Sequence, residues 1–453
     1  MQLRDYQQQA VSDLRVAMRQ VQSALLVMPT GAGKTVVFTE IARSATARGK
    51  STFVLVHRRE LVKQASSKLQ LAGVDHGIIA GGFKPSAHKV QVASVQTLAR
   101  RLRTVPAEPD LIIIDEAHHA VAGSWGKIID RFPNAKRIGV TATPSRLDGR
   151  GLGSHFNTLL QGPSVEQLVK LGYLSPHKVF APPVVADLSK VKTRAGDYAK
   201  DQLSDAMARP SVTGDAVSHY RRLADGLPAI AFCCSIEHAT SVCESFKAAG
   251  YRSKLVTGDM PMDERDDAIS GLADGRTQVL CSIDVVSEGT DVPAVSAAIL
   301  LRPTQSEALY LQQVGRILRP QPNKVAIVLD HVGNTVKHGF VDDCRTWSLD
   351  AKPKRQRNDE PAPSVRQCPK CFAAFKPQPT CPCCGFEFPV KPKRQLTQRE
   401  GELREMRRQD IIERREKRKE QGRARTLPEL LALAKKKGYK PGWAYKIFYG
   451  RRY

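Results

Sequence analysis

The feature that most constrains this chain is a glycine-rich segment, Met28-Pro29-Thr30-Gly31-Ala32-Gly33-Lys34-Thr35. An apolar run, Ala24–Met28, leads into it, and a helical pattern from about Thr35 to Ser44 follows, so the sequence predicts a buried strand, a loop and a helix. Glycine lets the backbone approach an anion without a Cβ clash, and a helix N-terminus attracts negative charge. We therefore expect a phosphate-binding loop in an α/β fold, although Met28 stands where this pattern prefers Gly or Ala.

The residue types of this segment suit Mg-ATP. Lys34 can reach the β- and γ-phosphates, and the Thr35 hydroxyl can hold Mg²⁺. The backbone around them would cradle the phosphates, so the predicted nucleotide-binding set is Thr30, Gly31, Ala32, Gly33, Lys34 and Thr35.

An acidic pair follows a second apolar run. Asp115 ends the expected strand Leu111–Asp115, where its carboxylate can hold Mg²⁺, and Glu116 can polarise an attacking water. We expect His118 to couple the nucleotide state to Thr141-Ala142-Thr143, and His119 to be an ordinary packed histidine.

A third segment, Gln312-Gln313-Val314-Gly315-Arg316-Ile317-Leu318-Arg319, carries two arginines three positions apart. We expect Arg316 and Arg319 to share one helix face and to contact a transferring phosphoryl group, with Gln312 beside them. An arginine finger accelerates such a reaction by a factor of ~10³–10⁵. Because the three segments lie far apart in sequence, two domains should close on one nucleotide.

Short β-rich runs alternate with helical patterns, which predicts parallel sheets covered on both faces. Expected strands in the first series are Ala24–Met28, Thr52–Val56, Val90–Ala93, Leu111–Asp115 and Arg137–Thr141. Those in the second are Ala229–Cys233, Arg252–Val256, Gln278–Cys281, Ala297–Leu301 and Val325–Leu329. Residues 165–228 between the two series are interrupted by prolines and give no clear pattern.

Five of the ten cysteines cluster between residues 368 and 384. Cys368, Cys371, Cys381 and Cys384 form two CxxC pairs, the spacing of a structural Zn²⁺ site, and Gly385 permits a tight turn after the last ligand. A redox dithiol pair or free thiols are the alternatives. Cys383 could also be a metal ligand together with Cys381 or Cys384. The other cysteines, Cys233, Cys234, Cys243, Cys281 and Cys344, are expected to be small buried residues.

The net charge of +25 is unevenly distributed. Residues 345–453 hold 29 Lys+Arg against 12 Asp+Glu. A basic tail on a mildly basic core favours a nucleic-acid partner, and a solvated charged tail is the alternative. The N-terminus has no apolar signal segment and no run is long enough to span a membrane, so we expect a cytoplasmic protein without a membrane partner.

In the order of these motifs the chain resembles the superfamily 2 DEAD/DEAH-type helicases, and specifically the RadD-like bacterial and phage DNA helicases. The likeness covers about residues 1–335. Besides the segments above it rests on Leu3-Arg4-Asp5-Tyr6-Gln7, Val56-His57-Arg58-Arg59-Glu60-Leu61, Ser94-Val95-Gln96-Thr97-Leu98, Gly139-Val140-Thr141-Ala142-Thr143-Pro144 with Arg146-Leu147-Asp148-Gly149, Thr257-Gly258-Asp259, and Ser287-Glu288-Gly289-Thr290-Asp291-Val292-Pro293.

The resemblance implies two tandem RecA-like domains that hydrolyse Mg-ATP and move on DNA. Tyr6 would stack on adenine and Gln7 would bind its edge. Gly289 and Asp291 would lie between nucleotide and strand, and loops with Thr97 and Thr257 would grip the strand backbone. The expected domains are 1–170 and 171–345 (RecA-like), 346–365 (linker), 366–390 (zinc ribbon), 391–425 (basic charged helix) and 426–453 (small helical unit).

The expected function is ATP-dependent DNA translocation or unwinding in repair, recombination or replication. An RNA helicase is a second interpretation, because the ATP site does not distinguish the nucleic acids. An ATP-gated DNA-binding or annealing protein, and the motor subunit of a restriction enzyme, are further alternatives. The tail could also bind a single-strand-binding or recombination protein.

Overall fold

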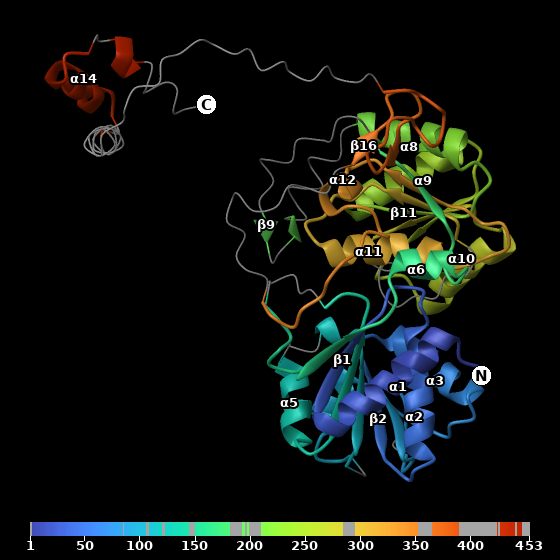
Figure 1. Cartoon of the computed structure of the whole chain (residues 1–453). Coiled ribbons are helices and arrows are strands. Elements are labelled where there is room, and N and C mark those ends of the chain that lie inside the picture. The colour runs from blue at the N-terminus through green and yellow to red at the C-terminus, as the bar shows by residue number, and fades with distance from the viewer. Residues whose placement is uncertain are drawn as a thin grey trace. The chain divides into compact units, whose positions relative to one another are not determined.

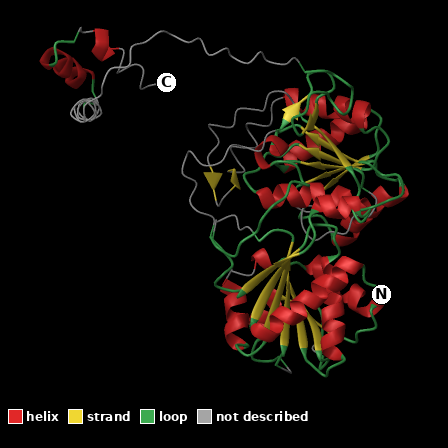
Figure 2. Ribbon diagram, in the orientation of Figure 1, coloured by secondary structure: helices red, strands yellow, loops and turns green. Residues whose placement is uncertain are grey.

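The computed structural model describes residues 2–84, 86–105, 108–119, 123–144, 150–181, 193–194, 197–198, 210–283, 295–351, 365–388, 424, 426–439 and 442–445. Met1–Pro389 form one compact unit and Val390–Tyr453 another. The larger unit contains two α/β lobes, each built on a twisted sheet with helices on both faces (Figures 1 and 2).

The first lobe is a seven-stranded sheet in the order β3-β4-β2-β5-β6-β1-β7, and every neighbouring pair in it is parallel. Its strands are β1 (Ser23–Val27), β2 (Thr52–Val56), β3 (Gly77–Ile79), β4 (Val90–Ser94), β5 (Leu111–Asp115), β6 (Lys136–Thr141) and β7 (Thr158–Gln161). Its helices are α1 (Asp5–Gln20), α2 (Lys34–Thr46), α3 (Arg59–Leu71), α4 (Val95–Arg101) and α5 (Gly123–Arg131). All residues of β1 and β2 are buried, as expected for parallel strands covered on both faces.

The second lobe is an eight-stranded sheet in the order β12-β13-β11-β14-β15-β8-β17-β16, parallel from β12 to β8. Its strands are β8 (His177–Phe180), β11 (Ala229–Phe232), β12 (Ser253–Val256), β13 (Val279–Ser282), β14 (Ala297–Leu300), β15 (Ala326–Asp330), β16 (Arg366–Gln367) and β17 (Ala373–Phe375). Its helices are α6 (Val165–Lys170), α8 (Pro210–Leu223), α9 (Ile236–Ala248), α10 (Met262–Asp274), α11 (Glu307–Gly315) and α12 (Asn334–His338). A hairpin of β9 (Thr193–Arg194) and β10 (Asp197–Tyr198) forms a separate small sheet.

The two tandem parallel-sheet lobes confirm the α/β fold expected from the sequence, and each expected strand is present with ends that differ by at most two residues. Residues 165–228, which show no clear sequence pattern, contain α6, β8 and α8. Strand β8 extends the second sheet beyond β15, and its other edge pairs with β17 of the cysteine-rich segment. That segment therefore continues the sheet of the second lobe.

The chain returns from the second lobe to the first after Arg345. The side chains of Trp347 and Leu349 pack against the apolar core of the first lobe. The Leu349 carbonyl accepts hydrogen bonds from the N–H groups of Leu152, at 2.8 Å, and Gly153, at 2.9 Å. The described beginning of the expected linker, residues 346–351, is thus bound to the first lobe, whereas 352–364 lie outside the described residues.

The smaller unit contains α14 (Leu427–Lys436), which begins at a capping box of Thr426 and Glu429. Leu430 and Ala434 form a small apolar cluster with Ala444. Apart from Ala424, the basic helix expected at 391–425 lies outside the described residues. None of the described helices combines the length and apolarity that crossing a membrane requires.

Candidate ATP site and cysteine centre

The phosphate loop, residues 28–35, lies between β1 and α2, as the sequence predicts. Gly31 and Gly33 adopt φ of 86° and 81°, and Gly33 is the N-cap of α2. The first N–H groups of a helix have no intrahelical partner, so those of α2 remain available to an anion. Met28 is fully buried, and Gly162 leaves room for its side chain because a Cβ there would lie 2.8 Å from the Met28 Cγ. Core packing therefore explains the departure from the usual loop pattern.

Lys34 lies at the base of this loop, with its Nζ 3.5 Å from the Met28 carbonyl oxygen. Burial lowers the pKa of Lys34, while the carboxylates of Glu116 and Asp115 oppose that shift and the guanidiniums of Arg316 and Arg319 add to it. Charged groups from both lobes therefore act on this one ammonium.

The sheet order β5-β6-β1 brings the acidic pair beside the loop, because parallel strands end at the same edge. Asp115 and Glu116 are 7% and 9% exposed. Burial, helped by the neighbouring Glu116 carboxylate, raises the pKa of Asp115 to about 7. The Glu116 backbone has a φ of 48°, and its N–H donates to Asp115 Oδ1 at 2.9 Å. A carboxylate pair this buried suits a divalent cation that would balance its charge.

His118 contacts Thr141, which ends β6. Its Nδ1 lies 3.0 Å from Thr141 Oγ1 and 3.4 Å from Glu116 Oε2. The Thr141 hydroxyl donates its hydrogen to the Thr143 carbonyl at 2.8 Å. In the contact between His118 and Thr141, the hydrogen is therefore on His118 Nδ1, which donates to Thr141 Oγ1. The contact expected between His118 and the 141–143 loop is present.

Tyr6 and Gln7 lie in the first turn of α1, next to the phosphate loop. The Tyr6 hydroxyl donates to the Ala32 carbonyl at 2.9 Å, and Gln7 Nε2 donates to the same oxygen at 3.2 Å. Gln7 Oε1 accepts from the Arg4 N–H at 3.0 Å. A Cβ on Gly33 would lie 2.5 Å from Gln7 Nε2. Gln7 therefore braces the loop, and binding an adenine edge would require it to exchange these bonds.

Tyr173, which the sequence analysis did not single out, lies beside Tyr6 and Arg4. Its ring centroid lies 5.2 Å from that of Tyr6, and the Arg4 guanidinium lies 4.5 Å from the Tyr173 centroid. The available signal was an aromatic residue in the unassigned stretch before β8. With Arg4, the two tyrosines offer flat surfaces suited to a base.

The arginine segment does not form the continuous helix face that the spacing predicted. Helix α11 ends at Gly315, Arg316–Leu318 is a 3₁₀ turn, and Arg319 is extended with φ −60° and ψ 133°. Pro320 explains why Arg319 is not helical, because the residue before a proline avoids the helical region. The Arg319 carbonyl instead accepts from Ser175 Oγ at 3.0 Å and Lys324 Nζ at 2.9 Å.

The phosphate loop touches the arginine segment directly. A Cβ on Gly31 would lie 4.0 Å from the Arg319 Cγ and 3.0 Å from the Leu174 Cδ2. Gln312 is 3% exposed, and its Nε2 has no hydrogen-bond partner within the described residues. The structure thus brings Lys34 and the arginine segment to one place, as the sequence predicts.

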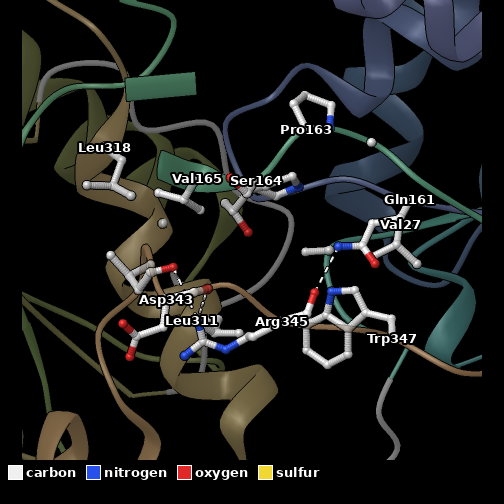
Figure 3. Close-up of a pocket in the computed structure, with 16 residues that line it drawn as sticks. Val27, Gln161, Pro163, Ser164, Val165, Leu311, Leu318, Asp343, Arg345 and Trp347 are labelled. Atoms are coloured by element: carbon white, nitrogen blue, oxygen red, sulfur yellow. Dashed lines mark hydrogen bonds between the residues drawn. The ribbon is translucent and has the colours of Figure 1, made fainter. Parts of the chain in front are cut away.

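A pocket beside the phosphate loop and the arginine segment is lined by residues of both lobes (Figure 3). The first lobe contributes Val27 and Gln161, and the second contributes Leu311 and Leu318 from the opposite side (Figure 3). Trp347 of the returning segment lies beside Val27 and Gln161. Gln161 Nε2 donates to the Arg345 carbonyl at 2.8 Å. The returning segment after Arg345 therefore helps to hold the lobes together at the ATP site.

Gly289, Asp291 and Arg146–Gly149 lie outside the described residues. Thr257 follows β12, as expected of a loop residue, whereas Thr97 lies in the first turn of α4.

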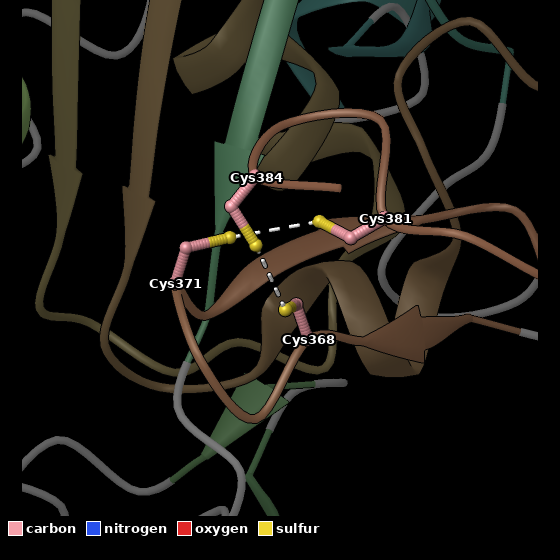
Figure 4. A group of neighbouring side chains, drawn as sticks. All are labelled: Cys368, Cys371, Cys381 and Cys384. Atoms are coloured by element: carbon pink, nitrogen blue, oxygen red, sulfur yellow. Dashed lines mark hydrogen bonds between the residues drawn. The ribbon is translucent and has the colours of Figure 1, made fainter. Parts of the chain in front are cut away.

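The four predicted cysteine ligands converge on one point (Figure 4). Their Sγ atoms all lie within 4.8 Å of one another, with Cys368–Cys384 at 3.5 Å and Cys371–Cys381 at 3.6 Å. Four sulfurs about 2.3 Å from a tetrahedral zinc would be about 3.8 Å apart. The donor set fits structural Zn²⁺, and Cys383 lies outside it.

The two CxxC turns have the same backbone geometry. Phe372 N–H donates to the Cys368 carbonyl and Gly385 N–H to the Cys381 carbonyl, at 2.9 and 3.0 Å. Phe372 and Gly385, which each follow the second cysteine of a pair, have φ of 61° and 70°. Gly385 has the turn conformation expected of it, and Phe372 adopts the same one.

The cysteine-rich segment packs on the second lobe through β17, which pairs antiparallel with β8. The ring centroids of Phe375 and Phe388 lie 5.8 Å apart, and both side chains pack in the apolar core of the second lobe. Of the other cysteines, Cys233, Cys234, Cys243 and Cys281 are buried as expected, but Cys344 is exposed. That prediction was wrong for Cys344, which lies in an irregular segment near Arg345, outside the sheet.

The model of the type III restriction enzyme res subunit matches residues 1–146, and the helicase conserved C-terminal domain matches residues 215–321. A 51.5 kDa protein of a Lactococcus phage is 35% identical over 384 residues, 84% of this chain and 81% of that protein. A Saccharomyces cerevisiae protein named as an ATP-dependent helicase, IRC3, is 32% identical over 73% of this chain and 51% of its own length. The DNA 3'-5' translocase XPB2 of Sulfurisphaera tokodaii is 26% identical over 72% and 81%.

The fold is shared by a fragment of an HsdR subunit of a type I restriction enzyme from Vibrio vulnificus, with a TM-score of 0.59 and 21% identity over 74% of this chain and 66% of that one. The matching domain models cover residues of both lobes, and the structure brings their motifs into contact. The chain belongs to the superfamily 2 DEAD/DEAH-type helicases and is a nucleic-acid-dependent ATP hydrolase.

Proposed function

We propose that this chain is a DNA helicase or translocase that couples Mg-ATP hydrolysis between its lobes to movement on, or unwinding of, DNA in repair, recombination or replication. The observation that carries the proposal is the contact between the phosphate loop and the arginine segment. Lys34 from the first lobe and Arg316 and Arg319 from the second lie close enough to shift the pKa of Lys34. A nucleotide held there would bridge the lobes.

The roles in this site follow from charge and position. Lys34 would neutralise the β- and γ-phosphates, and the Thr35 hydroxyl and Asp115 would hold Mg²⁺, which supplies charge stabilisation at the phosphates. Glu116 would polarise the attacking water. With His118 bound to Thr141, a change at Glu116 would reach the end of β6.

Arg316, Arg319 and Gln312 would act from the second lobe. Guanidiniums suit the charge that develops on the transferring phosphoryl group. Arg316 is 7% exposed and held in a 3₁₀ turn, so its position is set before the nucleotide arrives. Loss of the γ-phosphate would remove the ligand that both lobes share and let them part.

DNA is the nucleic acid that we favour. The relative XPB2 is named as a DNA translocase, and the first-lobe family model and the HsdR structure carry the names of restriction enzymes. The basic C-terminal region would add sequence-independent attraction to phosphates. Comparing the stimulation of ATP hydrolysis by DNA and by RNA of equal length tests this assignment, and stronger stimulation by RNA would overturn it.

The cysteine centre would hold one structural Zn²⁺, because all four positions of a tetrahedron are filled by sulfur. We further propose the domain limits 1–170, 171–345, 366–390 and 426–453, with α6 (Val165–Lys170) at the first boundary lying beside the second lobe (Figure 1), and action in the cytoplasm.

The test of the central assignment is ATP turnover with single-stranded, duplex and forked DNA. Lys34→Ala should abolish stimulated turnover, and strand-displacement assays should then separate unwinding from movement alone. Lys50→Ala is the matched control, because Lys50 belongs to an exposed ion pair with Asp110 and should retain turnover. Full activity of Lys34→Ala would contradict the assignment.

A further inference from the structure

Three histidines form a continuous stack at the carboxyl edge of the first sheet. The ring centroids of His57 and His119 lie 4.4 Å apart, and those of His119 and His118 lie 4.1 Å apart. The rings are tilted by 43° and 41°. His119 therefore touches a ring on each side.

The strand order explains why these residues meet. His57 directly follows β2, and His118 and His119 follow β5, which is the neighbour of β2. Parallel neighbours end at the same edge, so residues 57 and 119 share it although they lie far apart in sequence.

The stack ends at the acidic pair on one side. His118 Nδ1 lies 3.4 Å from Glu116 Oε2, and the His119 N–H donates to the Glu116 carbonyl at 3.0 Å. Glu116 has the uncommon φ of 48°, a conformation that persists only where neighbouring groups hold it. The orientation of Glu116 thus depends on the histidines that contact it.

The other end of the stack lies in a segment that resembles a strand-contacting motif, Val56–Leu61. Gln96 Nε2 donates to the His57 carbonyl at 3.0 Å, and Gln96 Oε1 accepts from Ser94 Oγ at 2.9 Å. The second strand-contacting segment, Ser94–Leu98, is therefore hydrogen-bonded to the first at the residue that begins the stack.

We infer that His119 is a positioning residue that transmits nucleic-acid binding to Glu116: a strand bound at Val56–Leu61 and Ser94–Leu98 displaces the His57 ring, which moves His119, His118 and Glu116 in turn. The inference rests on the proposed function, because it assumes that DNA stimulates the ATPase. It assigns to His119 a role that an ordinary packed histidine does not have.

The test measures the stimulation ratio, which is ATP turnover with saturating single-stranded DNA divided by turnover without DNA. His119→Ala should lower this ratio about tenfold, within the usual range of coupling between sites. DNA affinity and the KM for ATP, measured in parallel, should change much less than the ratio. A fall in the ratio cannot come from misfolding, because a damaged fold would lower both turnover rates together.

Two further variants test the ring contacts. His119→Phe keeps a planar ring between its neighbours and should retain most of the ratio. In a double-mutant cycle, His57→Ala combined with His119→Ala should lower the ratio no further than the more severe single variant. The inference would be overturned if the reductions in the ratio from His57→Ala and His119→Ala multiplied in the double variant. It would also be overturned if His119→Phe were as defective as His119→Ala.

His76→Ala is the matched control. His76 lies in the same lobe, with Nε2 2.7 Å from Ser66 Oγ and Nδ1 2.8 Å from the Val74 carbonyl, away from the stack. Its ratio should equal that of the wild type. A wild-type enzyme that DNA does not stimulate would overturn the proposed function together with this inference. A stimulated wild type with an unchanged ratio in His119→Ala would overturn the inference alone.

Discussion

The side chain of Thr30, in the phosphate loop, lies against the backbone of Gly315 in the other lobe, so that a Cβ on residue 315 would come 2.5 Å from the Thr30 Cβ. It would also lie 3.0 Å from the Thr30 Cγ2 and 3.2 Å from its Oγ1. The lobes therefore approach each other at a place where only glycine fits, directly before Arg316.

Gly315→Ala should prevent this approach. Because the added methyl meets the Thr30 side chain, the lobes would have to separate, and an ångström of misplacement can cost about a hundredfold in rate. We expect the kcat for stimulated ATP hydrolysis to fall by about that factor while nucleotide binding by the first lobe is retained. Steady-state kinetics and titration with a fluorescent ADP analogue measure the two quantities.

Gly126→Ala is the control for this variant. Gly126 lies in α5, and a Cβ there would meet nothing within 4 Å. Alanine in a helix should be neutral or stabilising by about 0.5–1 kcal/mol. Wild-type kcat in Gly315→Ala would show that closure does not require the Thr30–Gly315 contact.

Ser175→Ala should slow hydrolysis without weakening nucleotide binding. Ser175 is 3% exposed, its N–H donates to the Leu318 carbonyl at 2.8 Å, and its hydroxyl donates to the Arg319 carbonyl. Losing one such bond costs about 1 kcal/mol, so kcat should fall roughly three- to tenfold. The KM for ATP should stay near that of the wild type, and Ser175→Thr should restore the rate.

The control is Ser253→Ala, another buried serine of the second lobe, whose hydroxyl donates to the Val279 carbonyl at 3.1 Å. Thermal unfolding should show similar losses for both variants, but only Ser175→Ala should lose kcat. Equal kinetic defects in the two would mean that Ser175 acts through stability alone.

Removal of the metal should destabilise the second lobe. Strand β17 begins two residues after the ligand Cys371 and covers the edge of β8. If free zinc exceeds its Kd about a thousandfold, the site contributes about 4 kcal/mol of stability. Chelation, or Cys371→Ser, should therefore lower the midpoint of thermal unfolding and release about one zinc per chain, measured by elemental analysis.

Cys383→Ser tests the register of the ligands. Cys383 is exposed and lies outside the four-sulfur group, although it sits between two of its members in sequence. This variant should keep its zinc and its unfolding midpoint. Loss of zinc from Cys383→Ser would show that the pairing assigned to Cys381 and Cys384 is wrong.

Truncation after Pro389, the boundary of the larger compact unit, should weaken DNA binding in a salt-dependent way. The removed region is strongly basic, and each lost phosphate contact should reduce the slope of log K against log salt by about 0.9 for duplex DNA. Fluorescence anisotropy over a range of salt concentrations measures this slope. An unchanged slope would show that the tail does not contact phosphates.

Much of the fold could be predicted because its signals are local. The apolar runs at Thr52–Val56 and Leu111–Asp115 each specify a buried strand within five residues, and both strands begin and end where the pattern does. Helix α1 was missed although Ala10, Val11, Leu14 and Met18 have helical spacing and are buried. The polar residues at the start of α1 obscured the regular spacing of its apolar residues.

Other features could not be predicted because they depend on distant partners. Arg319 was expected on a helix, but Pro320 and the bonds from Ser175 and Lys324 hold it extended. Strand β8 lies in a proline-interrupted stretch, and its place in the sheet depends on pairing with β15 and β17. Such pairing has no signature within the segment itself.

The sequence by itself determined the chemistry: a phosphate loop, an acidic pair, two arginines and four thiolates, since each depends on residue types at short spacing. Only the tertiary structure decided which of these groups meet. The parallel order of β2, β5, β6 and β1 places His57, Glu116, Thr141 and Lys34 along one edge, and the missing Cβ of Gly315 lets Thr30 approach it. Those contacts join residues that are distant in sequence, where packing rather than local periodicity sets the distance.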